Sequence, residues 1–294
     1  MLPLIVVIGA VQSVIAIVGL AHHSLLMYSG TVMRAAGSFL SPNSLYTLML
    51  FCLIPGIVAV LSARSAASLL PLAMACSTMF AALLLTWSRG GALAIGVAAV
   101  WIAARIGGRR HAAAAAIASL MLVLITFHVR THDQTSMAST QRSNASRLSS
   151  LRSGIAMVAR HWELGYGTGA LADPVPVVTD GVVSGSVALN PRNMPLLFLE
   201  ENGVLGELVA LAACVLVLRA LYLRRGEMAT SLGAIWCAAV TSGLFDTPFL
   251  VKSRPDGNVL LGLLLGATLL YLSTSEVSGR VVGTEGGDAC RELD

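Results

Sequence analysis

Apolar residues run along this chain in long unbroken stretches, which are separated by shorter polar segments. The stretches cover residues 2–21, 44–63, 67–87, 91–106, 112–128, 195–218, 230–246 and 257–273. Each is near the length that an α-helix needs to cross about 30 Å of hydrocarbon. A transmembrane β-strand would instead alternate apolar and polar residues over about ten positions. The pattern therefore predicts an all-α integral membrane protein with about eight transmembrane helices.

The longest polar interval, residues 129–194, is long enough to hold structure of its own. Within it, residues 131–150 are rich in Ser, Thr, Asn and Gln, which is typical of a mobile segment. Apolar residues at three- and four-residue steps then predict an amphipathic helix that carries Leu148, Leu151, Ile155, Val158 and Trp162 on one face. Such a helix would lie on the membrane surface with Trp162 at headgroup level, or pack on the protein itself. In either case Arg147 borders the apolar face.

Basic residues in two short connections predict the orientation of the helices. The connections between the fourth and fifth and between the sixth and seventh stretches contain Arg105, Arg109, Arg110, Arg219, Arg224 and Arg225. Clusters of this kind favour the cytoplasmic side. Both termini are then cytoplasmic. The 129–194 interval lies on the periplasmic face together with the turn 88–91 and the connections 22–43 and 245–256.

The same pattern divides the chain into four parts. We expect an N-terminal bundle of about five helices over 1–128, a periplasmic loop over 129–194, about three helices over 195–273 and a disordered cytoplasmic tail over 274–294. The run from Met1 to Ala21 lacks the positively charged start and cleavage site of a signal peptide. We therefore expect it to remain as a membrane helix.

Composition agrees with a membrane protein and excludes other classes. Hydrophobic residues make up 56% of the chain and charged residues 12%, with a mean hydropathy of +0.79. The net charge of +4 comes from basic residues scattered between apolar runs, which argues against nucleic-acid binding. Four of the five cysteines lie in apolar stretches without CxxC spacing, so neither a disulfide framework nor a zinc site is indicated. No metal and no cofactor is expected.

Arginines are the candidate binding groups because their planar, permanently charged donors suit phosphate. The polar interval contains Arg130, Arg142, Arg147, Arg152, Arg160 and Arg192. Arg89 stands alone between two apolar stretches, where burying an unpaired charge would cost several kcal/mol. Either Arg89 reaches the outer headgroups, or it forms an anion clamp with Arg147.

Acidic groups on the same predicted face have two interpretations each. Asn193 and Pro195 suit a helix start, and Glu201 follows within two turns, where a carboxylate is favoured by the helix dipole. Glu201 is alternatively a general base or the partner of an arginine. Asp246 is either a solvated helix end or a group that binds sugar hydroxyls or orients an arginine.

The histidines are weaker candidates for a base. His22 and His23 are adjacent, so on a helix they point about 100° apart and form a poor metal clamp. On the predicted amphipathic helix, His161 points away from Arg147. The turn from Gly165 to Gly169 lacks the preceding strand and the spacing of a nucleotide-binding loop, so it predicts a flexible turn.

Four local patterns, in this order along the chain, resemble the O-antigen ligase and O-antigen polymerase superfamily of bacterial membrane glycan transferases. The first, residues 34–43 (RAAGSFLSPN), is similar to the family's Gly-(Thr/Ser)-Phe-x-x-Pro-Asn. The second, residues 86–91 (TWSRGG), resembles its Ser-Arg-Gly at a helix start. The third runs from residues 146–148 (SRL) to residues 165–169 (GYGTG) and resembles its loop helix followed by a Gly-x-Gly turn. The fourth, residues 192–206, matches its His-Asn-x-x-Leu…Glu-x-Gly-x-x-Gly except that Arg192 replaces the His.

The resemblance implies a metal-independent membrane glycosyltransferase of polysaccharide or lipopolysaccharide biosynthesis in the bacterial inner membrane. Its donor would be a glycan on a polyprenyl diphosphate, such as undecaprenyl diphosphate, and its acceptor a glycan, lipid or protein hydroxyl at the periplasmic face. In the family, arginines that match Arg89 and Arg147 hold the diphosphate, and the His is the candidate base. Arg192 cannot replace that base because a guanidinium stays protonated, so it would add a phosphate contact beside Asn193.

Two alternatives remain at this point. A solute transporter would show charges or broken helices near mid-membrane and two similar halves, neither of which the sequence shows. An inactive or accessory member of the superfamily would explain Arg192. Members usually have more helices at the front, so whether Met1 is the true start stays open, as do the sugar, the acceptor and the oligomeric state.

Overall fold

The computed structural model describes residues 2–29, 32–39, 41–132, 134–167, 175–179, 182–187, 193–245 and 255–285. Over these residues the helices are α1 (Leu2–Ala21), α2 (Pro42–Ser62), α3 (Ala66–Leu85), α4 (Arg89–Ile106), α5 (Gly108–Thr131), α6 (Gln134–Val158), α7 (Met194–Leu223), α8 (Glu227–Gly243) and α9 (Pro255–Glu285). Two antiparallel hairpins complete the described elements, β1 (Leu26–Ser29) with β2 (Val32–Ala35) and β3 (Val175–Thr179) with β4 (Val182–Val187).

The predicted all-α membrane class agrees with the structure. In the described residues six helices, α1 to α5 and α7, are long and apolar enough to cross a membrane, and α9 contains a shorter apolar segment, Val259–Thr274. Each of the eight apolar stretches of the sequence falls largely within a helix. The count of eight spans and the periplasmic side of the polar interval stay predictions.

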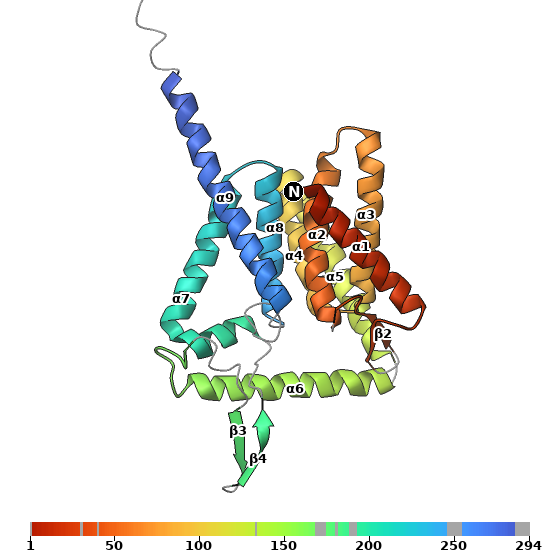
Figure 1. The fold of residues 1–294 in the computed structure, drawn as a ribbon, viewed down its shortest axis with the longest axis vertical. Helices are drawn as coiled ribbons and strands as arrows, with labels where there is room; N and C mark the ends of the chain where they lie inside the picture. The colour runs from red at the N-terminus through yellow and green to blue at the C-terminus, as the bar shows by residue number, and fades with distance from the viewer. Residues whose placement is uncertain are drawn as a thin grey trace, which may run out of the picture.

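Helices α1 to α5 and α8 form a bundle, and α7 and α9 flank α8 on its other side (Figure 1). Helix α6 lies across one end of the bundle, at the bottom of the view, and runs from the end of α5 to below the bend of α7 (Figure 1). The β1–β2 hairpin and the starts of α2 and α4 lie at this same end (Figure 1). The fold therefore gathers the turns that carry the sequence patterns at one end of the molecule.

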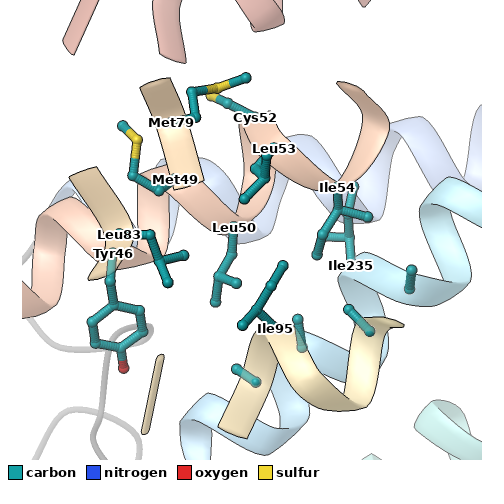
Figure 2. Packing of buried hydrophobic residues seen from close by; sticks show 14 of the residues in the cluster. Tyr46, Met49, Leu50, Cys52, Leu53, Ile54, Met79, Leu83, Ile95 and Ile235 are labelled. Atoms are coloured by element: carbon teal, nitrogen blue, oxygen red, sulfur yellow. The ribbon is translucent and has the colours of Figure 1, made fainter. Parts of the chain in front are cut away.

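Helix α2 occupies the centre of the core. It begins at Pro42, a residue suited to a first helical turn, and the Ser41 side chain caps it by accepting from the Ser44 backbone N at 3.2 Å. Its side chains meet α3, α4 and α8 in a closely packed cluster (Figure 2). The largest fully buried side chains of this helix are those of Leu45, Tyr46, Met49, Leu50, Leu53, Ile54 and Val58. Lipid tails are as apolar as this core, so the hydrophobic effect does not hold the helices together within a membrane. The close packing of the side chains stabilises the bundle instead.

Helix α6 corrects one prediction from the sequence. Residues 134–150, expected to be mobile, are helical, and the helix ends at Val158, before Trp162. Its protein-facing positions include the buried Thr140 and Gly154 and the half-buried Arg147, whereas Ile155 is exposed. An apolar period does not reveal this helix, because the side chains that face the protein are polar and small.

Helix α7 bends sharply at Gly203, whose φ of 65° and ψ of −175° are not helical. The part of α7 before the bend packs beside α6, and the part after it rises along the bundle (Figure 1). Helix α9 continues to Glu285, beyond residue 274 where the sequence predicts a disordered tail.

Candidate functional site

The turn between α3 and α4 places Arg89 at the first position of α4. The Ser88 side chain caps that helix by accepting from the Gly91 backbone N at 3.2 Å, and Trp87 before it has a φ of 48°. A positive φ at a bulky residue is strained, and a cation at a helix N-terminus is disfavoured by the helix dipole. Such costs are typical of functional sites.

Glycines beside Arg89 let two aromatic rings approach. A Cβ on Gly91 would lie 3.1 Å from the Tyr46 ring, and one on Gly90 would lie 3.3 Å from the Phe245 Cβ. The Ser-Arg-Gly pattern therefore has a local physical reason: serine caps the helix, and the glycines leave room for Tyr46 and Phe245 to pack next to the arginine.

Arg34 reaches the same turn from strand β2. Its Nε donates to the Thr86 backbone O at 2.8 Å, and its Nη2 donates to the Asn43 Oδ1 at 3.4 Å. Thr86 ends α3, so Arg34 binds a carbonyl at a helix C-terminus, where a cation is favoured. The hydrogen bond from Arg34 to Thr86 therefore connects the first sequence pattern, residues 34–43, to the second, residues 86–91.

Helix α6 contributes two further polar groups. Asn144 Oδ1 accepts from the Arg89 Nη2 at 3.0 Å, and Arg147 Nη1 donates to the Phe245 backbone O at the end of α8. The Arg147 Nε is buried and has no hydrogen-bond partner in the described part of the chain. The Arg89 Cζ lies 5.9 Å from the centre of the Phe127 ring, so α5 also holds this arginine.

These groups surround one cavity of about 420 Å³. Its described lining consists of Arg34, Asn43, Tyr46, Ser88, Arg89, Gly90, Leu93, Val123, Ser143, Asn144, Arg147 and Phe245. Three guanidinium groups face it, and no carboxylate is among these lining residues. A cavity of this charge suits an anion, and the amide and hydroxyl groups around it suit oxygen-rich ligands.

The predicted partners Arg89 and Arg147 are thus brought together, from segments far apart in the sequence. Asn193 lies close by: its Nδ2 donates to the Leu244 backbone O at 2.9 Å, and its Oδ1 caps α7 by accepting from the Leu196 N at 3.0 Å. It connects the start of α7 to the end of α8, next to the cavity residue Phe245. Arg192 and Asp246 lie outside the described residues.

The acidic residues of α7 lie apart from this lining. Glu201 is 8% exposed, and its neighbour Glu200 is 1% exposed. Both Glu200 carboxyl oxygens are buried without a hydrogen-bond partner in the described residues. Glu200 lies against α6, where a Cβ on Gly154 would be 2.1 Å from its Oε1. The structure therefore singles out Glu200 as the unusual acid, whereas the sequence singled out Glu201.

The third and fourth sequence patterns meet at the bend of α7. The bend frees the Val204 backbone N, which donates to the Trp162 O at 2.8 Å. The freed carbonyls of Glu200 and Glu201 accept from the Tyr166 and Gly167 backbone N atoms, each at 2.8 Å. The segment after α6 thus satisfies the polar backbone that the bend exposes. Glycines are needed because side chains would collide: a Cβ on Gly203 would be 2.2 Å from the Glu163 O.

Three of these groups were not predicted from the sequence. Arg34 lies within the first local pattern, but only the hairpin fold brings it to the cavity that Arg89 lines. Asn144 lies in a segment that the sequence predicts to be mobile. Glu200 lies next to Glu201, which the sequence favours as the candidate acid. His161 packs edge-on against Tyr166, with ring centres 4.5 Å apart, and His22 and His23 follow α1; none of the three is among the described lining residues.

Comparisons with known proteins agree with the sequence patterns. The family model described as O-antigen ligase matches residues 74–211, which run from within α3 into α7 and include Arg89, Arg147 and the bend at Gly203. No curated protein matches this chain. The match over residues 74–211 supports the membership of the O-antigen ligase/polymerase superfamily that the four patterns predict.

Proposed function

We propose that this protein transfers a glycan from a polyprenyl diphosphate carrier to an acceptor hydroxyl at the periplasmic face of the inner membrane. The observation that carries the proposal is the cavity faced by Arg34, Arg89 and Arg147, with no carboxylate in its described lining. The O-antigen ligase domain supports glycan transfer of this general kind. The diphosphate donor, the acceptor and the roles of single residues are our inference.

The reaction breaks the bond between the sugar C1 and a diphosphate oxygen, and the acceptor oxygen forms the new bond to C1. Negative charge grows on the departing diphosphate as that bond breaks. Guanidinium groups bind this charge through short, charge-assisted hydrogen bonds, so their contacts strengthen in the transition state. Arg89 and Arg147 are the proposed clamp, and Arg34 is a third contact that the fold adds.

The acceptor hydroxyl must also lose a proton. Arg192 cannot take it, because a guanidinium stays protonated at physiological pH. Glu201 is the acid proposed from the sequence, and Glu201→Gln tests it, since an amide cannot accept the proton. Replacing Arg192 with His tests whether a base has been lost: a gain of transfer would indicate an accessory or inactive member. A loss of existing transfer would indicate that Arg192 binds substrate.

The test of the clamp is glycan transfer in membranes that contain the full chain. Arg89→Ala and Arg147→Ala are each expected to lower turnover about 100-fold or more, as the loss of one transition-state donor does elsewhere. Arg142→Ala is the matched control: it removes an arginine of the same helix α6, exposed and absent from the described lining. Unchanged turnover in the Arg89 and Arg147 variants, at equal protein levels, would refute the clamp.

A further inference from the structure

Two adjoining cavities lie at the end of the bundle opposite to the arginine cavity. The first, of about 540 Å³, lies between α2 and α4 beside the start of α5 and is mainly apolar; Ile57, Ile95, Ala99 and Ile102 line it, and His111 is the polar side chain among its described lining residues. The second, of about 460 Å³, lies where α2 and α4 end and α8 begins. Leu61 and Ile106 line both, so the two cavities adjoin, and together they are called the groove below.

The second cavity is basic. Arg105 and Arg225 line it together with Tyr222 and Thr230, and Glu227 is the one acid among its described lining residues. Arg105 is fixed by donating to the Tyr222 and Arg224 backbone O atoms, and its Cζ lies 5.4 Å from the Tyr222 ring centre. Its Nε is buried with no hydrogen-bond partner in the described chain. Arg225 is exposed at the rim.

This groove is separate from the candidate site. Helix α4 begins at Arg89 and ends at Ile106, so Arg105 lies about 24 Å from Arg89 along the helix axis. The end that holds Arg105 also carries Arg109, Arg110 and Arg219, the cluster from which the sequence predicts a cytoplasmic side.

We propose that this groove binds one anionic phospholipid, with its phosphate between Arg105 and Arg225 and an acyl chain in the apolar part. Arginine forks bind phosphate well, and basic pockets between transmembrane helices bind lipid headgroups. The apolar continuation selects a lipid over a free anion. Leu61 and Ile106, which line both cavities, are 57% and 54% exposed. Their side chains would contact the acyl chain where it leaves the headgroup. The proposal is independent of glycan transfer.

The test is native mass spectrometry of the full-length protein in detergent with added phosphatidylglycerol or phosphatidylcholine of identical acyl chains. We expect the wild type to retain phosphatidylglycerol in preference to phosphatidylcholine. Arg225→Gln is expected to weaken that retention about fivefold, the effect of one basic residue near an anionic headgroup. Leu61→Trp fills the junction and is expected to weaken it as well. Arg219→Gln, an exposed arginine of α7 outside the described lining, is the matched control.

Three results would overturn the proposal. Equal retention of the two lipids would show that the headgroup charge is not recognised. Equal losses in Arg219→Gln and Arg225→Gln would show only a diffuse attraction of the basic end. Displacement of phosphatidylglycerol by inorganic phosphate at equal concentration would show an anion site without an acyl-chain site. Retention that falls in Arg225→Gln and Leu61→Trp but persists in Arg219→Gln supports the groove.

Discussion

Replacing Gly203 with alanine tests the bend of α7 and its contact with the segment after α6. The φ of 65° and ψ of −175° belong to a region that essentially only glycine adopts. An added Cβ would also lie 2.2 Å from the Glu163 backbone O, closer than two atoms can approach without the chain moving. The substitution must therefore either straighten α7 or push the 162–167 segment away.

The expected cost follows from these two effects. Backbone strain contributes about 1–3 kcal/mol. Three backbone hydrogen bonds of 2.8 Å, donated by Val204, Tyr166 and Gly167, depend on the bend, and each contributes about 1 kcal/mol. Loss of some or all of them brings the total to about 2–6 kcal/mol, a large part of the stability of a typical domain.

Hydrogen exchange of the backbone amides is the assay, since it reports the local contact directly. In Gly203→Ala the Tyr166 and Gly167 amides are expected to exchange at least tenfold faster than in wild type, and unfolding by a denaturing detergent is expected at a lower concentration. Gly266→Ala is the matched control, because it lies in helix α9 with nothing within 4 Å of its added Cβ. Exchange rates in Gly203→Ala equal to those of wild type and of Gly266→Ala would refute the role given to this bend.

Three further outcomes are expected. Arg34→Gln should lower glycan transfer at least tenfold by removing a cavity charge and its bond to the Thr86 O, whereas the exposed control Arg64→Gln should not; equal activities in a membrane transfer assay would contradict this. Raising the ionic strength from about 0.05 to about 0.5 M should raise the KM for a diphosphate-linked donor, because salt screens the arginines; a constant KM in steady-state kinetics would speak against charge recognition. Gly154→Ala should destabilise the protein by about 1–3 kcal/mol, because its Cβ would lie 2.1 Å from the Glu200 Oε1. Adding Glu200→Ala should relieve that loss, and simple additivity in a double-mutant cycle of unfolding would reject the contact.

The class of the protein and the helices of its bundle can be predicted from the order of its residues. Long apolar runs can satisfy their backbone in lipid only as helices, so composition and length suffice to place them. The ordered local patterns also predicted the family, and the O-antigen ligase match over residues 74–211 supports it. Capping groups such as Ser88 and Asn193 act on their own helices, so their positions could be inferred from neighbouring residues alone.

Which polar groups share a cavity follows from the folded arrangement of the chain. Arg34, Arg89 and Arg147 come from a hairpin, a helix start and a surface helix, and no local pattern states that the three segments meet. The full length of α6 could not be predicted for the same reason. Its protein-facing side chains are polar, so no apolar pattern marks the helix, and its stability depends on contacts with α5 and α7. The buried Glu200 and the bend at Gly203 likewise depend on what packs against them, because burial and backbone contact are properties of the folded chain.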